Sequence, residues 1–116
     1  MKLLGIGNAI VDVLCKFTDK FLIEHSLKKS TMKLVDEIEF KKLLLSLKIE
    51  GTVSGGSVAN SIVGLSQMGN DVGFIGKVSD DDLGVKYEEG LKSENVSYMY
   101  NKKKEDLPTG TCLILV

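Results

Sequence analysis

The stretch with the clearest chemical potential is SGGSVANSIVGLSQMG, residues 54–69, in which two glycines stand directly before a helical pattern. Glycine lets a ligand come close to the backbone, and the first N–H groups of a helix have no partner within that helix. Asn60 stands one turn inside, and its amide both donates and accepts hydrogen bonds. Gly55, Gly56 and Asn60 would therefore suit a polar ligand with vicinal hydroxyls, such as a sugar.

A sugar site also needs an acceptor, and Asp12 is the natural candidate. This residue follows the first predicted core strand and interrupts the apolar stretch IVDV. A carboxylate accepts hydrogen bonds from several donors at once. The alternative is that Asp12 and Asn60 only cap turns, and the spacing alone leaves both interpretations open.

Two further glycine motifs do not fit the nucleotide-binding loops they resemble. GIGN at 5–8 lacks the third glycine of a dinucleotide fingerprint, because Ile10 stands there and no helical pattern follows. IGKVS at 75–79 lacks the first glycine of a phosphate-binding loop, since that position is Asp71. We therefore predict neither site.

No catalytic or metal-binding residue emerges from the remaining side chains. His25, the one histidine, lies in a short amphipathic segment and is expected to pack. No serine or cysteine has a plausible base partner. The acidic run at 80–82 precedes a helical pattern, where carboxylates favour the helix N-terminus, and its spacing is only a weak signal for a metal site.

The composition indicates one globular domain at most, in 116 residues. Fifteen basic and sixteen acidic residues nearly cancel, which argues against nucleic-acid or membrane partners. No apolar run is long enough for a membrane span, and no signal peptide is recognisable. We expect a cytoplasmic protein in which Cys15 and Cys112 are reduced.

The predicted elements that would position these residues alternate between strands and helices, which is typical of an α/β fold with a parallel sheet. Strands at 2–7, 52–55 and 72–77 should form the central sheet, with helices at 36–48, 57–68 and 82–94 on its faces. Four other strands lack full-length helices between them and should form a separate small sheet, near 11–17, 31–35, 96–101 and 111–116. Because the chain stops inside an apparent strand at LILV, we expect a fragment.

These motifs together resemble the N-terminal part of the ribokinase (PfkB carbohydrate kinase) family, and their details are most similar to adenosine kinases. The glycine stretch is similar to the first signature of the family, and GIGNAIVDV to its opening strand. TDKFLIEHSLKK, FIGKVSDDDLG and LPTGTCLILV match in order and spacing. The resemblance covers essentially all 116 residues.

The resemblance implies a ribokinase-like fold and transfer of phosphate from MgATP to a hydroxymethyl group of a sugar or nucleoside. It places Asp12, Gly55, Gly56 and Asn60 on the sugar, and Asn8 and Ser57 near the base of a nucleoside. The small sheet would be a lid over the substrate, with Thr109, Gly110 and Cys112 on its last strand near the pocket. The catalytic Asp and the ATP site would lie beyond the chain end, so residues 1–116 alone should be inactive.

Two other functions stay open at this point. One is a free-standing, non-catalytic module that binds a ligand or dimerises, and a homodimer could form through the lid sheet. The other is a structural α/β domain without a ligand. The identity of the phosphate acceptor and the need for a monovalent cation do not follow from the residues.

Overall fold

The computed structural model describes residues 2–116, which divide into two compact units. The first unit contains the residues up to Asp12 together with Val53–Cys112, and the second contains Val13–Thr52 and Leu113–Val116. All seven residues predicted to bind the ligand belong to the first unit.

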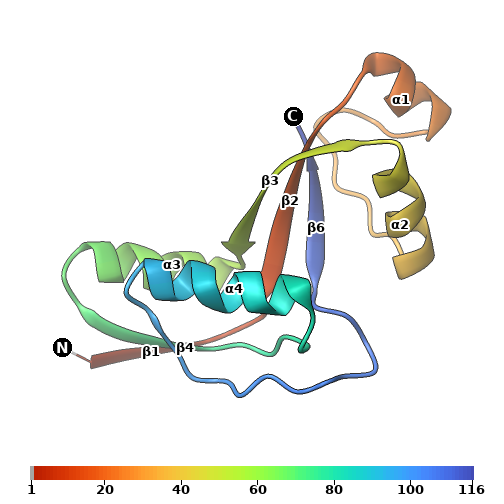
Figure 1. Cartoon of the computed structure of the whole chain (residues 1–116). Helices are drawn as coiled ribbons and strands as arrows, with labels where there is room; N and C mark the ends of the chain where they lie inside the picture. The colour runs from red at the N-terminus through yellow and green to blue at the C-terminus, as the bar shows by residue number, and fades with distance from the viewer. Residues whose placement is uncertain (1) are drawn as a thin grey trace. The chain divides into compact units, whose positions relative to one another are not determined.

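The first unit is built on a three-stranded parallel sheet. Its strands are β1 (Lys2–Ile6), β4 (Asp71–Ile75) and β5 (Ser97–Tyr98), in the order β1-β4-β5. Helices α3 (Ser57–Gln67) and α4 (Asp82–Ser93) lie side by side on one face of this sheet (Figure 1). Parallel neighbours need a crossover connection, and α4 supplies the one between β4 and β5.

A close approach of α3 to β1 holds this layer together. A Cβ at Gly5 would lie 2.5 Å from Cγ1 of Ile62, so only glycine lets the helix come this near. The largest fully buried side chains of the unit include Phe74, Tyr87 and Leu91, which come from β4 and α4. Ser57 and Asn60 lie in the first turn of α3, so they are carried by a helix that packs closely on this sheet.

The second unit contains helices α1 (Asp19–Glu24) and α2 (Glu37–Leu45). Thr18 and Asp36 cap them by accepting hydrogen bonds from the N–H groups of Phe21 and Glu39. A buried apolar cluster of the unit contains Phe21, Leu22 and Leu43. A second sheet has the order β3-β2-β6, with β3 at Lys48–Gly55, β2 at Ile10–Lys16 and β6 at Thr111–Leu115. Each of these three strands has residues in both units.

The α/β fold class with a second small sheet is confirmed, and so are two of the four predicted small-sheet strands, β2 and β6. The prediction of a strand at 31–35 is wrong, since this segment forms no strand. Met32 and Leu34 are 87% and 88% exposed, so the apolar side chains of this segment do not pack into a core as those of a strand would. Sequence alternation alone does not provide the partner strand that a sheet needs.

Three other predictions need correction. The strand near 96–101 shortens to β5 and pairs with β4 in the central sheet, because the α4 crossover returns the chain beside β4. The strand predicted at 52–55 for the central sheet is the end of β3, which pairs with β2 in the second sheet. The helix predicted at 36–48 on the central sheet is α2, which packs in the second unit through Leu43.

Candidate functional site

The glycine pair forms the junction between β3 and α3. Gly55 ends the strand and is buried, while Gly56 is the N-cap of the helix with φ of +102°. A side chain at Gly56 would be strained by this φ and would also collide with the backbone oxygen of Asn8. The backbone of Asn8 therefore packs directly on this turn. Asn8 itself is an exposed residue.

The carboxylate of Asp12 lies against Gly55. A Cβ at Gly55 would stand only 2.6 Å from Asp12 Oδ2 and 3.1 Å from Oδ1. Asp12 is half-buried, and burial raises the pKa of its carboxyl group. No hydrogen bond or ion pair reaches this carboxylate from the described residues of its own unit. A strong acceptor thus lies beside the glycine turn, and no donor among the described residues of its own unit pairs with it.

The first turn of α3 adds unpaired donors at the same junction. Gly56 offers no side-chain cap, and the first backbone bond of the helix runs from Asn60 N–H to Gly56 O at 2.9 Å. The N–H groups of residues 57–59 precede that bond and have no partner within their unit among the described residues. The helix dipole makes this end attractive for electron-rich groups.

The other predicted ligand residues are exposed near these elements. Asn60 and Ser57 lie in the first turn of α3, and no hydrogen bond within the described part of the unit engages the Asn60 side chain. Cys112 lies in β6, and burial, followed by the charge of Asp12, raises the pKa of its thiol. The structure therefore brings Asp12 against Gly55 and Asn8 against Gly56, and it places Cys112 within electrostatic reach of Asp12. Both cysteines are free thiols, as predicted.

Two supporting groups were not found by sequence reasoning. The hydroxyl of Tyr87, which is completely buried, donates to Gly55 O at 3.2 Å. Ser54 donates in turn to Tyr87 O at 3.0 Å. No pattern in the sequence indicates that the hydroxyl of Tyr87 supports the glycine turn, because Tyr87 and Gly55 are 32 positions apart.

A network around Thr109 lies just before β6. Thr109 is 3% exposed, its N–H donates to Asp81 Oδ2 at 2.9 Å, and its hydroxyl donates to Asp81 Oδ1 at 2.6 Å. The next residue, Gly110, accepts a hydrogen bond from Val11 N–H at 2.9 Å. The segment predicted to approach the pocket is thus bonded to the residue that precedes Asp12.

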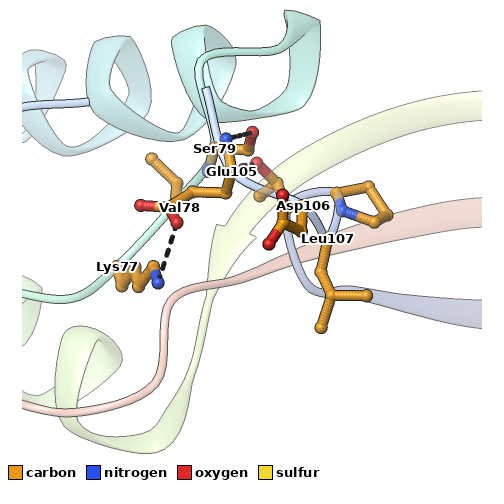
Figure 2. Close-up of a pocket in the computed structure, with 8 residues that line it drawn as sticks. Lys77, Val78, Ser79, Glu105, Asp106 and Leu107 are labelled. Atoms are coloured by element: carbon orange, nitrogen blue, oxygen red, sulfur yellow. Dashed lines mark hydrogen bonds and ion pairs between the residues drawn. The ribbon is translucent and has the colours of Figure 1, made fainter. Parts of the chain in front are cut away.

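A separate pocket of about 350 Å³ is lined by residues 77–79 and 105–109 (Figure 2). Lys77 and Glu105 form an ion pair of 3.0 Å across it, and Lys77 lowers the pKa of Glu105. Of the residues implied by the resemblance only Thr109 contributes to its lining, and none of the seven predicted ligand residues does. We therefore do not assign the sugar to this pocket.

No cluster of three or more potential metal ligands occurs in residues 2–116. Likewise, no helix in the described part of the chain is long and apolar enough to cross a membrane. The arrangement at the glycine turn can bind hydroxyl groups, because it offers a charged acceptor beside unpaired donors. It offers no general base in contact with a nucleophile.

Comparisons with known proteins indicate the family and the fold of this chain. A family model described as "pfkB family carbohydrate kinase" matches residues 35–116. A fructokinase of Escherichia coli is 40% identical over 60 residues, which cover 52% of this chain and 20% of that relative. The chain therefore spans a small part of the curated relative that it matches.

Two solved structures are similar over nearly the whole chain. The adenosine kinase of Sinorhizobium meliloti and a probable sugar kinase of Rhizobium etli each give a TM-score of 0.85 at 30% identity. In both cases the match covers 99% of this chain and 35% of the other chain. The chain thus corresponds to about a third of those structures.

Proposed function

Because the chain belongs to the PfkB carbohydrate kinase family, we propose that it is the substrate-binding part of a kinase that phosphorylates a sugar or nucleoside. The reaction would move phosphate from MgATP to a hydroxymethyl group of the acceptor. The observation that carries this proposal is the half-buried Asp12 carboxylate, which lies against Gly55 without a hydrogen-bond partner in its unit.

In this proposal two vicinal hydroxyls of the sugar donate to Asp12, and the open N–H groups of α3 and the amide of Asn60 complete the binding. Gly55 and Gly56 let the sugar ring approach the backbone. Asn8, Ser57 and Cys112 would surround the remainder of the substrate, which is the base in the case of a nucleoside. The hydrogen bonds of the Tyr87 hydroxyl to Gly55 O and of the Ser54 hydroxyl to Tyr87 O would keep the glycine turn in place.

The proposal assigns MgATP and the catalytic base to residues other than those of this chain. Residues 2–116 offer no metal-ligand cluster, and the two glycine motifs at 5–8 and 75–79 do not have the pattern of nucleotide loops. Phosphoryl transfer depends on positioning and on stabilisation of charge at the phosphate. The residues described here would supply the positioning of the acceptor, and the isolated 116-residue chain should show no turnover.

The acceptor is proposed as either a nucleoside or a free sugar. A solved structure with the same fold is an adenosine kinase, while a curated relative is a fructokinase. We further propose that the protein is cytoplasmic, because ATP is available in the cytoplasm. We also propose that the second small sheet forms either a lid or a homodimer contact.

A thermal-shift screen of the complete protein against nucleosides and free sugars tests this function. A ligand that binds only the folded state raises the melting temperature. We expect adenosine, ribose or fructose to do so for the wild type and not for Asp12→Asn, followed by MgATP-dependent phosphorylation of the same compound. A ligand that binds without any phosphorylation would favour a non-catalytic binding module, and the absence of binding by every sugar and nucleoside would refute the proposal.

A further inference from the structure

The carboxylate of Asp81 makes more hydrogen bonds than a helix cap requires. Its Oδ1 accepts from Gly84 N–H at 2.7 Å, which caps α4. The same atom also accepts from the Thr109 hydroxyl at 2.6 Å, and Oδ2 accepts from Thr109 N–H at 2.9 Å. Burial opposes ionisation of Asp81, yet the bonds from Thr109 and Gly84 outweigh it and hold its pKa below the usual value.

Asp36, the cap of α2, shows what capping alone needs. It accepts one hydrogen bond, from Glu39 N–H at 2.8 Å, and is exposed. The two further bonds of Asp81 therefore hold the segment at Thr109, 28 residues away in the sequence, rather than the helix. Thr109 is fixed from a third side, because its Oγ1 also accepts from Ser79 N–H at 3.1 Å.

The segment held by Asp81 is bonded directly to the strand that carries Asp12. Gly110 O accepts from Val11 N–H at 2.9 Å, and Val11 is only 1% exposed. A Cβ at Gly110 would stand 3.2 Å from Ala9 O, so the two backbones lie in close contact. The backbone next to Asp12 is thus tied to residue 110 by a hydrogen bond, in addition to the pairing of β2 with β3 and β6.

We propose that Asp81 is a positioning residue for the ligand-binding carboxylate: it fixes Thr109 and Gly110, which hold Val11 and so set the place of Asp12. This inference rests on the proposed function, in which Asp12 binds the hydroxyls of the acceptor. Asp81 does not touch the ligand. It acts through two successive hydrogen-bonded contacts inside one compact unit, from Asp81 to Thr109 and from Gly110 to Val11.

The test compares Asp81→Asn with Asp36→Asn in the complete protein. An amide has a single acceptor oxygen, so Asp81→Asn loses at least one of the three hydrogen bonds while it keeps the size of the side chain. Asp36→Asn removes the same charge from a cap in the other unit. A second pair of variants tests the Thr109 hydroxyl while the charge of Asp81 is kept. Thr109→Val loses this hydroxyl, and Thr109→Ser keeps it.

Three measurements are made on each variant: the melting temperature, the affinity for adenosine and for fructose, and the hydrogen-exchange rate of the Val11 amide. The Met99 amide, which donates to Phe74 O at 2.9 Å in the same unit, serves as the reference for exchange. We expect about tenfold weaker ligand binding and about tenfold faster exchange of Val11 relative to Met99 in Asp81→Asn and Thr109→Val. Asp36→Asn and Thr109→Ser should leave the ligand affinity and the exchange rate of Val11 relative to Met99 unchanged.

The outcomes separate this inference from the function on which it rests. If the wild type binds neither adenosine nor fructose nor another sugar, the proposed function fails. If the wild type binds a ligand and Asp81→Asn retains full affinity with unchanged Val11 exchange, the positioning role is overturned. A lower melting temperature with intact affinity in Asp81→Asn would show that Asp81 is only a helix cap.

Discussion

Replacing Asp12 by asparagine removes the charge from the candidate site with almost no change in shape. The side chain stays half-buried against Gly55, so the local packing is retained. Burial raises the pKa of Asp12, and no ion pair in its unit offsets that cost. The charge therefore opposes folding at neutral pH, and we expect the variant to melt at the same temperature as the wild type or slightly higher.

The loss of ligand binding should be large by comparison. Each hydrogen bond to a charged acceptor contributes about 1.5–3 kcal/mol, against about 0.5–1.5 kcal/mol for a neutral one. Two hydroxyls that donate to one carboxylate would thus lose about 3 kcal/mol in total, since the amide also turns one acceptor into a donor. At 1.36 kcal/mol for each factor of ten, the affinity falls by at least about a hundredfold.

The assay is isothermal titration of the complete protein with the compound that raises its melting temperature, together with melting curves on the same samples. Asp71→Asn is the control, because it removes one charge from an exposed residue of β4. We expect full affinity in Asp71→Asn and a hundredfold loss in Asp12→Asn. An unchanged affinity in Asp12→Asn, or a lower melting temperature with binding intact, would refute the reasoning.

Three further predictions concern the same junction. The affinity for the sugar should fall as the pH drops through the raised pKa of Asp12, because only the ionised group accepts both hydroxyls, and Asp12→Asn should abolish this dependence in a pH series of titrations. Asn60→Ala removes one neutral partner, so titration should show a loss of about 1 kcal/mol, or roughly fivefold. Gly56→Ala places a side chain at φ of +102° against Asn8 O and should lower the free energy of unfolding by at least about 2 kcal/mol in urea melts. Gly64→Ala in the same helix, where a Cβ meets nothing within 4 Å, should instead raise it by about 0.5–1 kcal/mol, and equal effects of the two substitutions would contradict this account.

Local signals in the sequence predicted the helices well. The helices predicted at 36–48, 57–68 and 82–94 correspond to α2, α3 and α4, and Asp36 and the glycine pair stand where α2 and α3 begin. These features depend on residues within four positions of one another. They can therefore be read from a short window of sequence.

Strand pairing could not be predicted in the same way, because it depends on partners far away in the chain. The end of β3 looked like a central strand, yet its partner is β2. The contact of Asp12 with Gly55 joins residues that local patterns cannot relate, and their role in binding stays a prediction. The support from Tyr87 spans 32 residues and depends on one hydroxyl, which no periodicity reveals.

The missing side-chain cap of α3 limits how this protein can be made more stable. A capping side chain adds about 1 kcal/mol to a helix, and the other three helices have one. The positive φ of Gly56 closes this route at α3, since serine or aspartate there would be strained. A cap at this end would also occupy the N–H groups that the ligand needs. The protein thus gives up stability at the position where it would gain affinity, and an engineered thermostable variant would have to find its improvement elsewhere.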